Sequence, residues 1–337
     1  MSQTTSIQDS QLPRERLGGF ALIAAAALAL VLANSPLAGA YQAIQRVEIL
    51  KELAIFLFFL SVGIELRHEI RHGSLRNPKQ AIVPIFAAIG GMLVPVILFS
   101  LINSGMSTAK GWGVPMSTDI AFALAIFAIA GRGLPKALRT FVMTVAVVDD
   151  SLTILMIAVF FTASFNILTV VSLAGVVIGL FMPGGNKLAP KLGPVVAFAA
   201  LPLFAFYSAG VSLGNVNAAA FATPLALGVL VGQLVGKPLG VLGTAWLVTK
   251  SRLGSLAHGL TWADLRAVGW LFAMCFTVSM LMVELNFPAI PLGTATYSSD
   301  MASDWHTIAV LSVFVATSVA GLISTLLLRR RAGELAK

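Results

Sequence analysis

Two adjacent aspartates, Asp149 and Asp150, stand inside an apolar stretch that runs from about residue 138 to residue 162. Asp119 and Lys237 also stand within stretches that are otherwise apolar. Placing one charge at the centre of a membrane helix costs about 2.5–3.5 kcal/mol, so such residues normally face a cavity, an ion pathway or a charged partner. A single lysine–aspartate pair that joins two helices would leave two of the acids unexplained. Three acids and one lysine therefore favour an ion-binding site.

The residues before Asp119 disfavour a continuous helix. Pro115 lacks an amide hydrogen, Gly113 precedes it, and Ser117 and Thr118 follow it. A helix that breaks inside a membrane frees backbone groups, which must find protein partners or line a cavity. The new helix ends also carry partial charges that a carboxylate or a lysine could balance. We therefore expect a broken helix at the ion site, with an ordinary proline kink as the alternative.

The elements that carry these residues are read from the hydrophobic runs. Of 337 residues, 58% are hydrophobic and only 11% are charged, against about 25% charged in a typical soluble domain. Long apolar runs predict transmembrane helices. Together they predict an all-α integral membrane protein with about ten transmembrane helices and a single domain covering 1–337. The ten apolar stretches are 17–38, 51–66, 80–103, 113–132, 137–162, 166–183, 194–213, 224–249, 266–287 and 306–328.

The basic residues indicate how the chain is oriented. If the N-terminus is cytoplasmic, 18 of the 22 Lys and Arg residues fall in cytoplasmic segments and 3 fall outside, and Lys237 remains within a helix. This split follows the positive-inside rule and predicts cytoplasmic N- and C-termini. The net charge of +8 is thus explained by membrane topology, and no nucleic-acid partner is expected. The single Cys275 excludes an internal disulfide framework.

Six motifs, spread in order over most of the chain, resemble those of the bacterial Na⁺/H⁺ antiporters of the NhaA family. They are VGIELRHEIRHGSL (62–75), AAIGGMLVP (87–95), PMSTDIAFALAI (115–126), VAVVDDSLTI (145–154), LPLFAFYSAGVSL (201–213) and VGKPLG (235–240). The resemblance implies a secondary transporter of the bacterial cytoplasmic (inner) membrane. It would exchange cytoplasmic Na⁺ or Li⁺ for external protons, with pH-dependent activity. It also implies a protein that is not an enzyme and needs no cofactor.

The resemblance assigns roles to eight residues. It implies that Asp149 and Asp150 bind Na⁺ and carry protons, together with Thr118 at the helix break. Asp119 and Lys237 would compensate charge there, Glu65 and Glu69 would belong to a cytoplasmic pH-sensing region, and Glu52 would lie near the funnel through which ions enter.

The chemistry of adjacent carboxylates fits these roles. Neighbouring residues on a helix project about 100° apart, so Asp149 and Asp150 can border one cavity while facing different partners. Burial and like charge favour a protonated carboxyl group, whereas a nearby cation favours the charged form. Competition between Na⁺ and protons for these acids would then need only alternating exposure of the site. We expect Lys237 to pair with deprotonated Asp149.

The resemblance also predicts inverted repeats at about 80–162 and 224–328, whose broken helices cross near the membrane centre. Three departures from the family modify this expectation. About two helices are missing before residue 171, and the loop 38–50 is too short for the β-hairpin through which family members dimerise. A monomer or weak homodimer is therefore expected. Ala273 and Cys275 replace expected glycines, which predicts a weaker second helix break.

The sequence allows three other interpretations. The string HEIRH (68–72) fits a zinc-protease pattern, but Arg67 and Arg71 surround its ligands and the remaining histidines are remote. An intramembrane aspartyl protease is disfavoured because no G-x-G-D string occurs and the key acids are adjacent. A homologue that binds ions or a partner without transporting them stays open as the alternative function.

Overall fold

The computed structural model describes residues 2–72, 78–160, 167–214, 216–287 and 301–336, and the regular structure within these ranges is helical. Each of the ten apolar stretches falls on a helix or on a succession of helical segments. Six of these helical stretches are long and apolar enough to cross a membrane. The all-α membrane fold is confirmed. A different set, the apolar stretches that form one continuous helix each, comprises α1 (Ser2–Ala33), α3 (Glu48–His72), α4 (Pro78–Ile102), α6 (Lys136–Phe160), α7 (Ile167–Phe181) and α14 (Met301–Leu335).

Two spans are broken by extended backbone. In the first, η2 (Ser107–Gly113) is followed by the non-helical residues 114–119, extended at 117–119, before α5 (Ile120–Ala130) begins. In the second, α12 (Trp262–Val268) and η6 (Gly269–Ala273) end before the non-helical residues 274–276, and α13 (Thr277–Asn286) follows. The second break is thus present, although Ala273 and Cys275 stand where glycines were expected, and its non-helical stretch is shorter than that of the first break.

Two further spans contain one π-helical turn each. The first joins α8 (Gly185–Val195), η3 (Val196–Ala200) and α9 (Leu201–Ser208). The second joins α10 (Pro224–Val231), η5 (Gly232–Gly236) and α11 (Lys237–Lys250), so a π turn ends directly before the buried lysine. Such single π turns are frequent at functional sites, because they rotate the residues that follow them.

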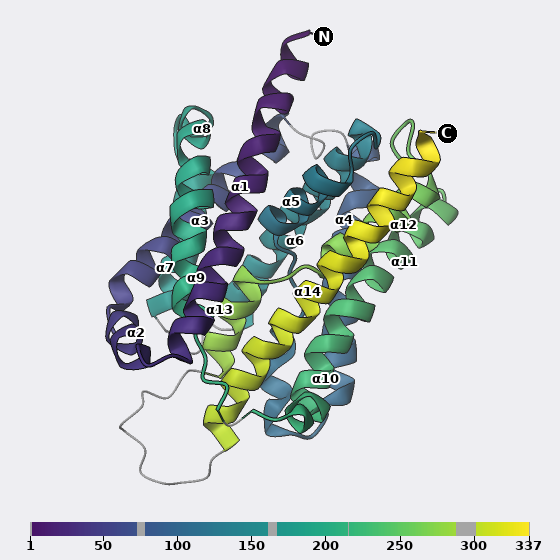
Figure 1. The fold of residues 1–337 in the computed structure, drawn as a ribbon. Helices are drawn as coiled ribbons and strands as arrows, with labels where there is room; N and C mark the ends of the chain where they lie inside the picture. The colour runs from purple at the N-terminus through teal and green to yellow at the C-terminus, as the bar shows by residue number, and fades with distance from the viewer. Residues whose placement is uncertain (1, 73–77, 161–166, 215, 288–300, 337) are drawn as a thin grey trace.

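The helices form two groups that meet along a seam (Figure 1). The first group contains α1, α3, α7, α8 and α9, and the second contains α4, α5, α6 and α10 to α14. Helices α1, α3 and α9 pack against α5, α6 and α13 at the seam. Glycines allow close approach within each group, as is common in membrane helices. A Cβ on Gly63 or Gly179 would overlap the backbone of the facing helix in the α3–α7 pair, and one on Gly240 would overlap Gly90 in the α4–α11 pair.

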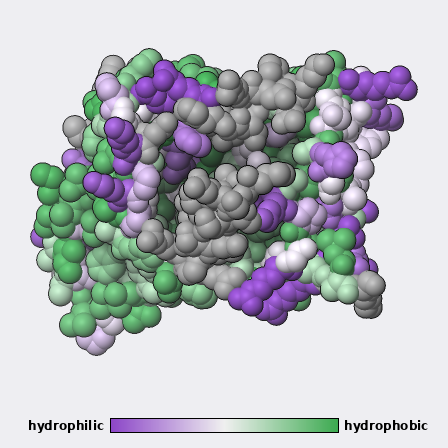
Figure 2. All heavy atoms as spheres, turned by 90° about the horizontal axis from the view of Figure 1, so that it is seen from above, coloured by the Kyte–Doolittle hydropathy of each residue, from purple (hydrophilic) through white to green (hydrophobic). Residues whose placement is uncertain are grey.

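The two ends of the bundle differ in charge. Both termini lie at the same end in Figure 1, which we call the basic end; the opposite end is the far end. Figure 2 looks onto the basic end and shows patches of hydrophilic side chains there, with hydrophobic side chains along the flank. The exposed basic residues at this end are Arg71, Arg132, Lys136, Lys187, Lys191, Lys250, Arg252, Arg266, Arg329 and Arg330.

The segment 38–50, predicted to be too short for a β-hairpin, contains a short helix. Helix α2 (Ala38–Gln45) lies at the far end, between α1 and α3. Tyr41 on this helix is buried, and its hydroxyl donates a hydrogen bond to the backbone carbonyl of Phe206 on α9. This segment therefore packs onto its own bundle.

Candidate functional site

The buried lysine forms an ion pair with the first aspartate. Lys237 Nζ lies 2.7 Å from Asp149 Oδ2, and the two side chains are only 1% and 2% exposed. The same Nζ donates a second hydrogen bond of 3.1 Å to the Thr118 hydroxyl. The pairing of Lys237 with Asp149 that was expected from the sequence is present. It joins α11, α6 and the first helix break.

Asp119 caps both helices that start at the two breaks. Its Oδ1 accepts hydrogen bonds from the backbone N–H groups of Ala121 and Phe122 in the first turn of α5. Its Oδ2 accepts hydrogen bonds from both the backbone N–H and the hydroxyl of Thr277, the first residue of α13. One carboxylate thus faces two positive helix ends, which stabilises a negative charge inside the membrane.

The second break is held open by hydrogen bonds from residues far away in the chain. The Asp119 N–H donates to Met274 O at 2.7 Å, and the Thr118 hydroxyl donates to Phe272 O at 2.9 Å. The Thr317 hydroxyl of α14 donates to Cys275 O at 2.8 Å. These donors satisfy the carbonyls that a break leaves free, so the break persists without glycine at 273 and 275. The two breaks are therefore in direct contact.

Asp150 lines a polar cavity at the seam between the two groups. The cavity has a volume of about 130 Å³, enough for several water molecules. Thr118, Asp119 and Thr277 line it from the second group, and Glu65 and Ser61 line it from the first. The remaining wall is apolar and includes Phe58, Val62, Val196, Ala197 and Leu201.

Two carboxylate oxygens at this site have no hydrogen-bond partner among the described residues. They are Asp149 Oδ1 and Asp150 Oδ1, and both are buried. Burying an unpaired carboxylate oxygen is costly, so such an atom calls for a proton or a cation. Carboxylate oxygens suit a hard alkali cation, and the same oxygens accept protons.

Glu65 lies at the cavity itself. Its side chain lines the same cavity as Asp150 and accepts a hydrogen bond of 3.2 Å from the Ser61 hydroxyl, one turn earlier on α3. Ser61 and Thr277 were not among the residues assigned from the sequence. The signal for Ser61 was its position four residues before Glu65 on a predicted helix, where two side chains share a face.

Of the other two predicted glutamates, Glu52 does not line the cavity. Glu52 is half-buried near the far end of α3, about 20 Å along the helix from Glu65. The side chains of Glu69 and His72 lie outside the described residues, so the pH-sensing role of Glu69 stays a prediction. His68 is exposed. Among the described residues, no group of three His, Cys, Asp or Glu side chains is placed to hold a metal ion.

The sequence matches the model of the protein family described as Na⁺/H⁺ antiporter 1, over residues 9–185 and 169–328. Proteins named Na⁺/H⁺ antiporter NhaA are similar over most of the chain. The protein from Frankia casuarinae is 34% identical, over 95% of this chain and 86% of its own length. That from Thermobifida fusca is 34% identical, over 82% and 85%. That from Aeromonas hydrophila is 33% identical, over 94% of each.

The matches also indicate that this chain is shorter than its relatives. The alignment with the Frankia protein runs over 392 positions, more than the 337 residues of this chain, so that protein contains segments that are absent here. The two parts of the family match overlap at 169–185. This is the region in which the sequence motifs indicated the loss of about two helices.

Proposed function

Because this chain belongs to the Na⁺/H⁺ antiporter 1 family, we propose that it exchanges Na⁺ or Li⁺ for protons across a bacterial cytoplasmic membrane. Cytoplasmic Na⁺ leaves and external protons enter, which serves Na⁺ and pH homeostasis. The function is that of a secondary transporter rather than an enzyme. The substrates are the two cations, and the bilayer is the surrounding solvent.

The observation that carries this proposal is the position of Asp150. Its carboxylate lines a polar cavity, and its Oδ1 has no hydrogen-bond partner within the described chain. A carboxylate in this position binds either a proton or Na⁺, and both together are disfavoured because each neutralises the same charge. Thr118, which lines the same cavity, offers a further oxygen to the cation.

The ion pair between Lys237 and Asp149 links the Asp149 carboxylate to the binding of Na⁺ or a proton. Lys237 neutralises Asp149 through the 2.7 Å ion pair while Asp149 Oδ1 remains without a partner. When Na⁺ binds between the two aspartates, it replaces part of the charge that the lysine supplies. The lysine is then free to release a proton or to turn toward Thr118, which already accepts one of its hydrogen bonds. Exchange follows when the loaded site is exposed alternately on the two sides.

The charge of the two ends supports an orientation. The basic end, with both termini, is placed in the cytoplasm because exposed Lys and Arg residues gather there. The cavity of Asp150 is lined by Glu65 and Gly193, which lie in the halves of α3 and of the α8–α9 span nearer the basic end, so it is closer to the cytoplasmic side. Residues 80–162 and 224–328 are taken as the two inverted repeats, since each runs in the order helix, broken helix, helix.

Transport in proteoliposomes tests the function. The purified protein is reconstituted, and an imposed Na⁺ gradient should drive proton movement in the opposite direction, while protein-free liposomes show only leak. Repeating the measurement with Li⁺ and K⁺ gradients defines the cation range. If the folded protein shows no proton flux under any Na⁺ gradient, the chain is the ion-binding homologue that does not transport.

A further inference from the structure

A second ion pair joins three helices near the far end. Lys51 Nζ of α3 lies 2.7 Å from Glu284 Oε2 of α13, and the two side chains are 19% and 11% exposed. The Ser208 hydroxyl of α9 donates a hydrogen bond of 2.8 Å to Glu284 Oε1. Both oxygens of Glu284 are therefore engaged, each by a different helix.

This ion pair lies one helical turn beyond an apolar pocket on all three helices. Residues three or four positions apart share a helix face. On each of the three helices, a residue of the ion-pair cluster lies three or four positions away from a residue that lines the pocket. The three pairs are Lys51 with Ile55, Ser208 with Phe204, and Glu284 with Leu281.

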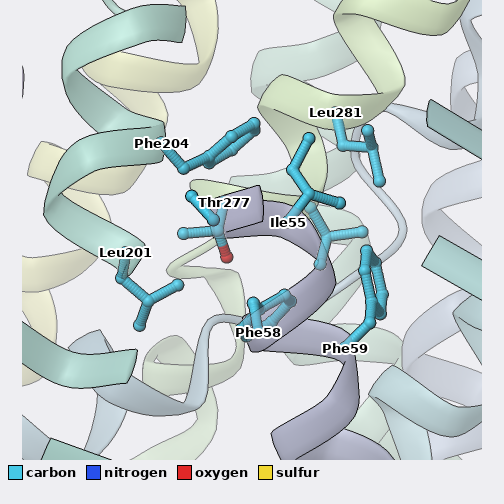
Figure 3. A pocket seen from close by; sticks show the side chains of 9 residues that line it. Ile55, Phe58, Phe59, Leu201, Phe204, Thr277 and Leu281 are labelled. Carbon is cyan, nitrogen blue, oxygen red and sulfur yellow. The ribbon is translucent and has the colours of Figure 1, made fainter. Parts of the chain in front are cut away.

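The apolar pocket separates the ion pair from the Asp150 cavity. Figure 3 shows Ile55, Phe59, Phe204 and Leu281 around it, and its volume is about 10 Å³, the lower limit for one water molecule. Phe58, Leu201 and Thr277 line both this pocket and the cavity of Asp150. From Asp150 toward the far end, the order is thus polar cavity, tight apolar pocket, and ion pair.

The ion pair also crosses the seam between the two groups of helices. Lys51 and Ser208 belong to the first group, whereas Glu284 belongs to the second, which also carries the site residues Asp149 and Asp150. Opening the site toward the far end requires the two groups to separate along this seam. Such separation breaks the Lys51–Glu284 contact and the Ser208 hydrogen bond.

We propose that Lys51, Glu284 and Ser208 form a latch that holds the far side closed while the Asp150 cavity is open toward the basic end. We call these three residues the far-end latch. They position the two groups for exchange without touching the transported ion, and this role rests on the proposed function. His306 of α14 is close enough to interact electrostatically with both charges, so it is left unchanged in the test.

Accessibility of the apolar pocket tests the latch independently of transport. In a Cys275→Ser background, Val278→Cys places one thiol in the pocket wall, where the native side chain is buried. Reaction with a membrane-impermeant maleimide from outside is timed in the parent and in Lys51→Gln and Glu284→Gln. Lys110→Gln, which removes an exposed lysine elsewhere at the far end, is the matched control.

The latch predicts severalfold faster labelling in Lys51→Gln and Glu284→Gln than in Lys110→Gln. The charge-swapped variant Lys51→Glu with Glu284→Lys should return labelling to the parent rate, which also shows that the fold tolerates changes at these positions. In Lys51→Gln and Glu284→Gln, the apparent affinity for Na⁺ should rise on the external side and fall on the cytoplasmic side. The reason is that a larger fraction of the protein is then open to the outside and a smaller fraction to the cytoplasm.

Two results would overturn the latch: labelling rates equal to that of Lys110→Gln, or a charge swap that labels as fast as the single variants. Exchange by the parent is measured in the same preparation. If the parent fails to exchange Na⁺, the proposed function fails while the labelling rates still report on the latch.

Discussion

Asp119 and Thr277, which are 158 residues apart in the sequence, join the two helix breaks through two hydrogen bonds. The Thr277 N–H and hydroxyl both donate to Asp119 Oδ2, at 3.2 and 2.9 Å. The same carboxylate also caps α5. A single side chain thus fixes the relative position of the two breaks, and Thr118, which precedes it, is held beside Lys237 as a consequence.

Removing the hydroxyl of Thr277 should weaken this junction. Thr277→Val deletes one hydrogen bond to a charged acceptor and leaves the N–H bond in place, so we expect a loss of about 1.5–3 kcal/mol. Thr277→Ser keeps the hydroxyl and should stay close to the parent. Thermal unfolding in detergent provides the comparison; equal stability of the two variants would show that this contact does not hold the breaks together.

Breaking the Lys237–Asp149 pair from one side should cost more than removing both charges. Lys237→Ala leaves a buried carboxylate without its cation, which costs about 3–5 kcal/mol in comparable buried pairs. The double variant Asp149→Asn with Lys237→Gln contains no unpaired charge and should unfold at a higher temperature than Lys237→Ala alone. If the double variant is less stable than Lys237→Ala, the unpaired Asp149 charge is not the cause of the stability loss in Lys237→Ala.

The contact between α4 and α11 depends on glycine at position 240. A Cβ there would overlap the backbone of Gly90, and overpacking of this kind costs about 1–3 kcal/mol, so Gly240→Ala should lower stability. Gly243→Ala on the same helix is the matched control, because its Cβ would meet no atom within 4 Å. We expect Gly243→Ala to be neutral or stabilising by up to about 1 kcal/mol, since alanine favours the helix. Similar melting temperatures for the two variants would refute the close packing.

Single cysteines should reveal the orientation of the bundle. In a Cys275→Ser background, cysteines at Ser107 and Ala219 are exposed at the far end and should react with an impermeant reagent added to intact cells. Cysteines at Ser255 and Lys191, exposed at the basic end, should react only after the membrane is opened. The reverse labelling pattern would place the termini outside the cell.

The sequence predicted the helices and the buried ion pair, because both have local signals. Apolar runs mark membrane helices, and a charge within such a run requires a partner. For Lys237, three acids were available as that partner: Asp119, Asp149 and Asp150. The persistence of the second break could not be predicted in this way. The absence of glycine at positions 273 and 275 is a local signal. The break is instead held by Thr118, Asp119 and Thr317, which come from other parts of the chain.

The far-end latch also lacked a sequence signal. Lys51 and Glu284 stand 233 positions apart, and each by itself is a normal charged residue near the end of a helix. Only the packing of α3, α9 and α13 brings them together. In the same way, Glu65 was assigned to a pH-sensing region because of its motif, whereas its place beside the Asp150 cavity depends on how α3 packs at the seam.

Na⁺/H⁺ exchange by the Asp150→Asn variant shows whether Asp150 binds the transported ion. Asp264→Asn is the matched control, because Asp264 is also a buried aspartate but pairs with Arg331, away from the cavity. Both variants are reconstituted at equal amounts, after their folding has been verified, and proton flux is driven by the same Na⁺ gradient. We expect Asp150→Asn to abolish exchange and Asp264→Asn to retain it. Exchange at the parent rate by folded Asp150→Asn would contradict the assignment of the site.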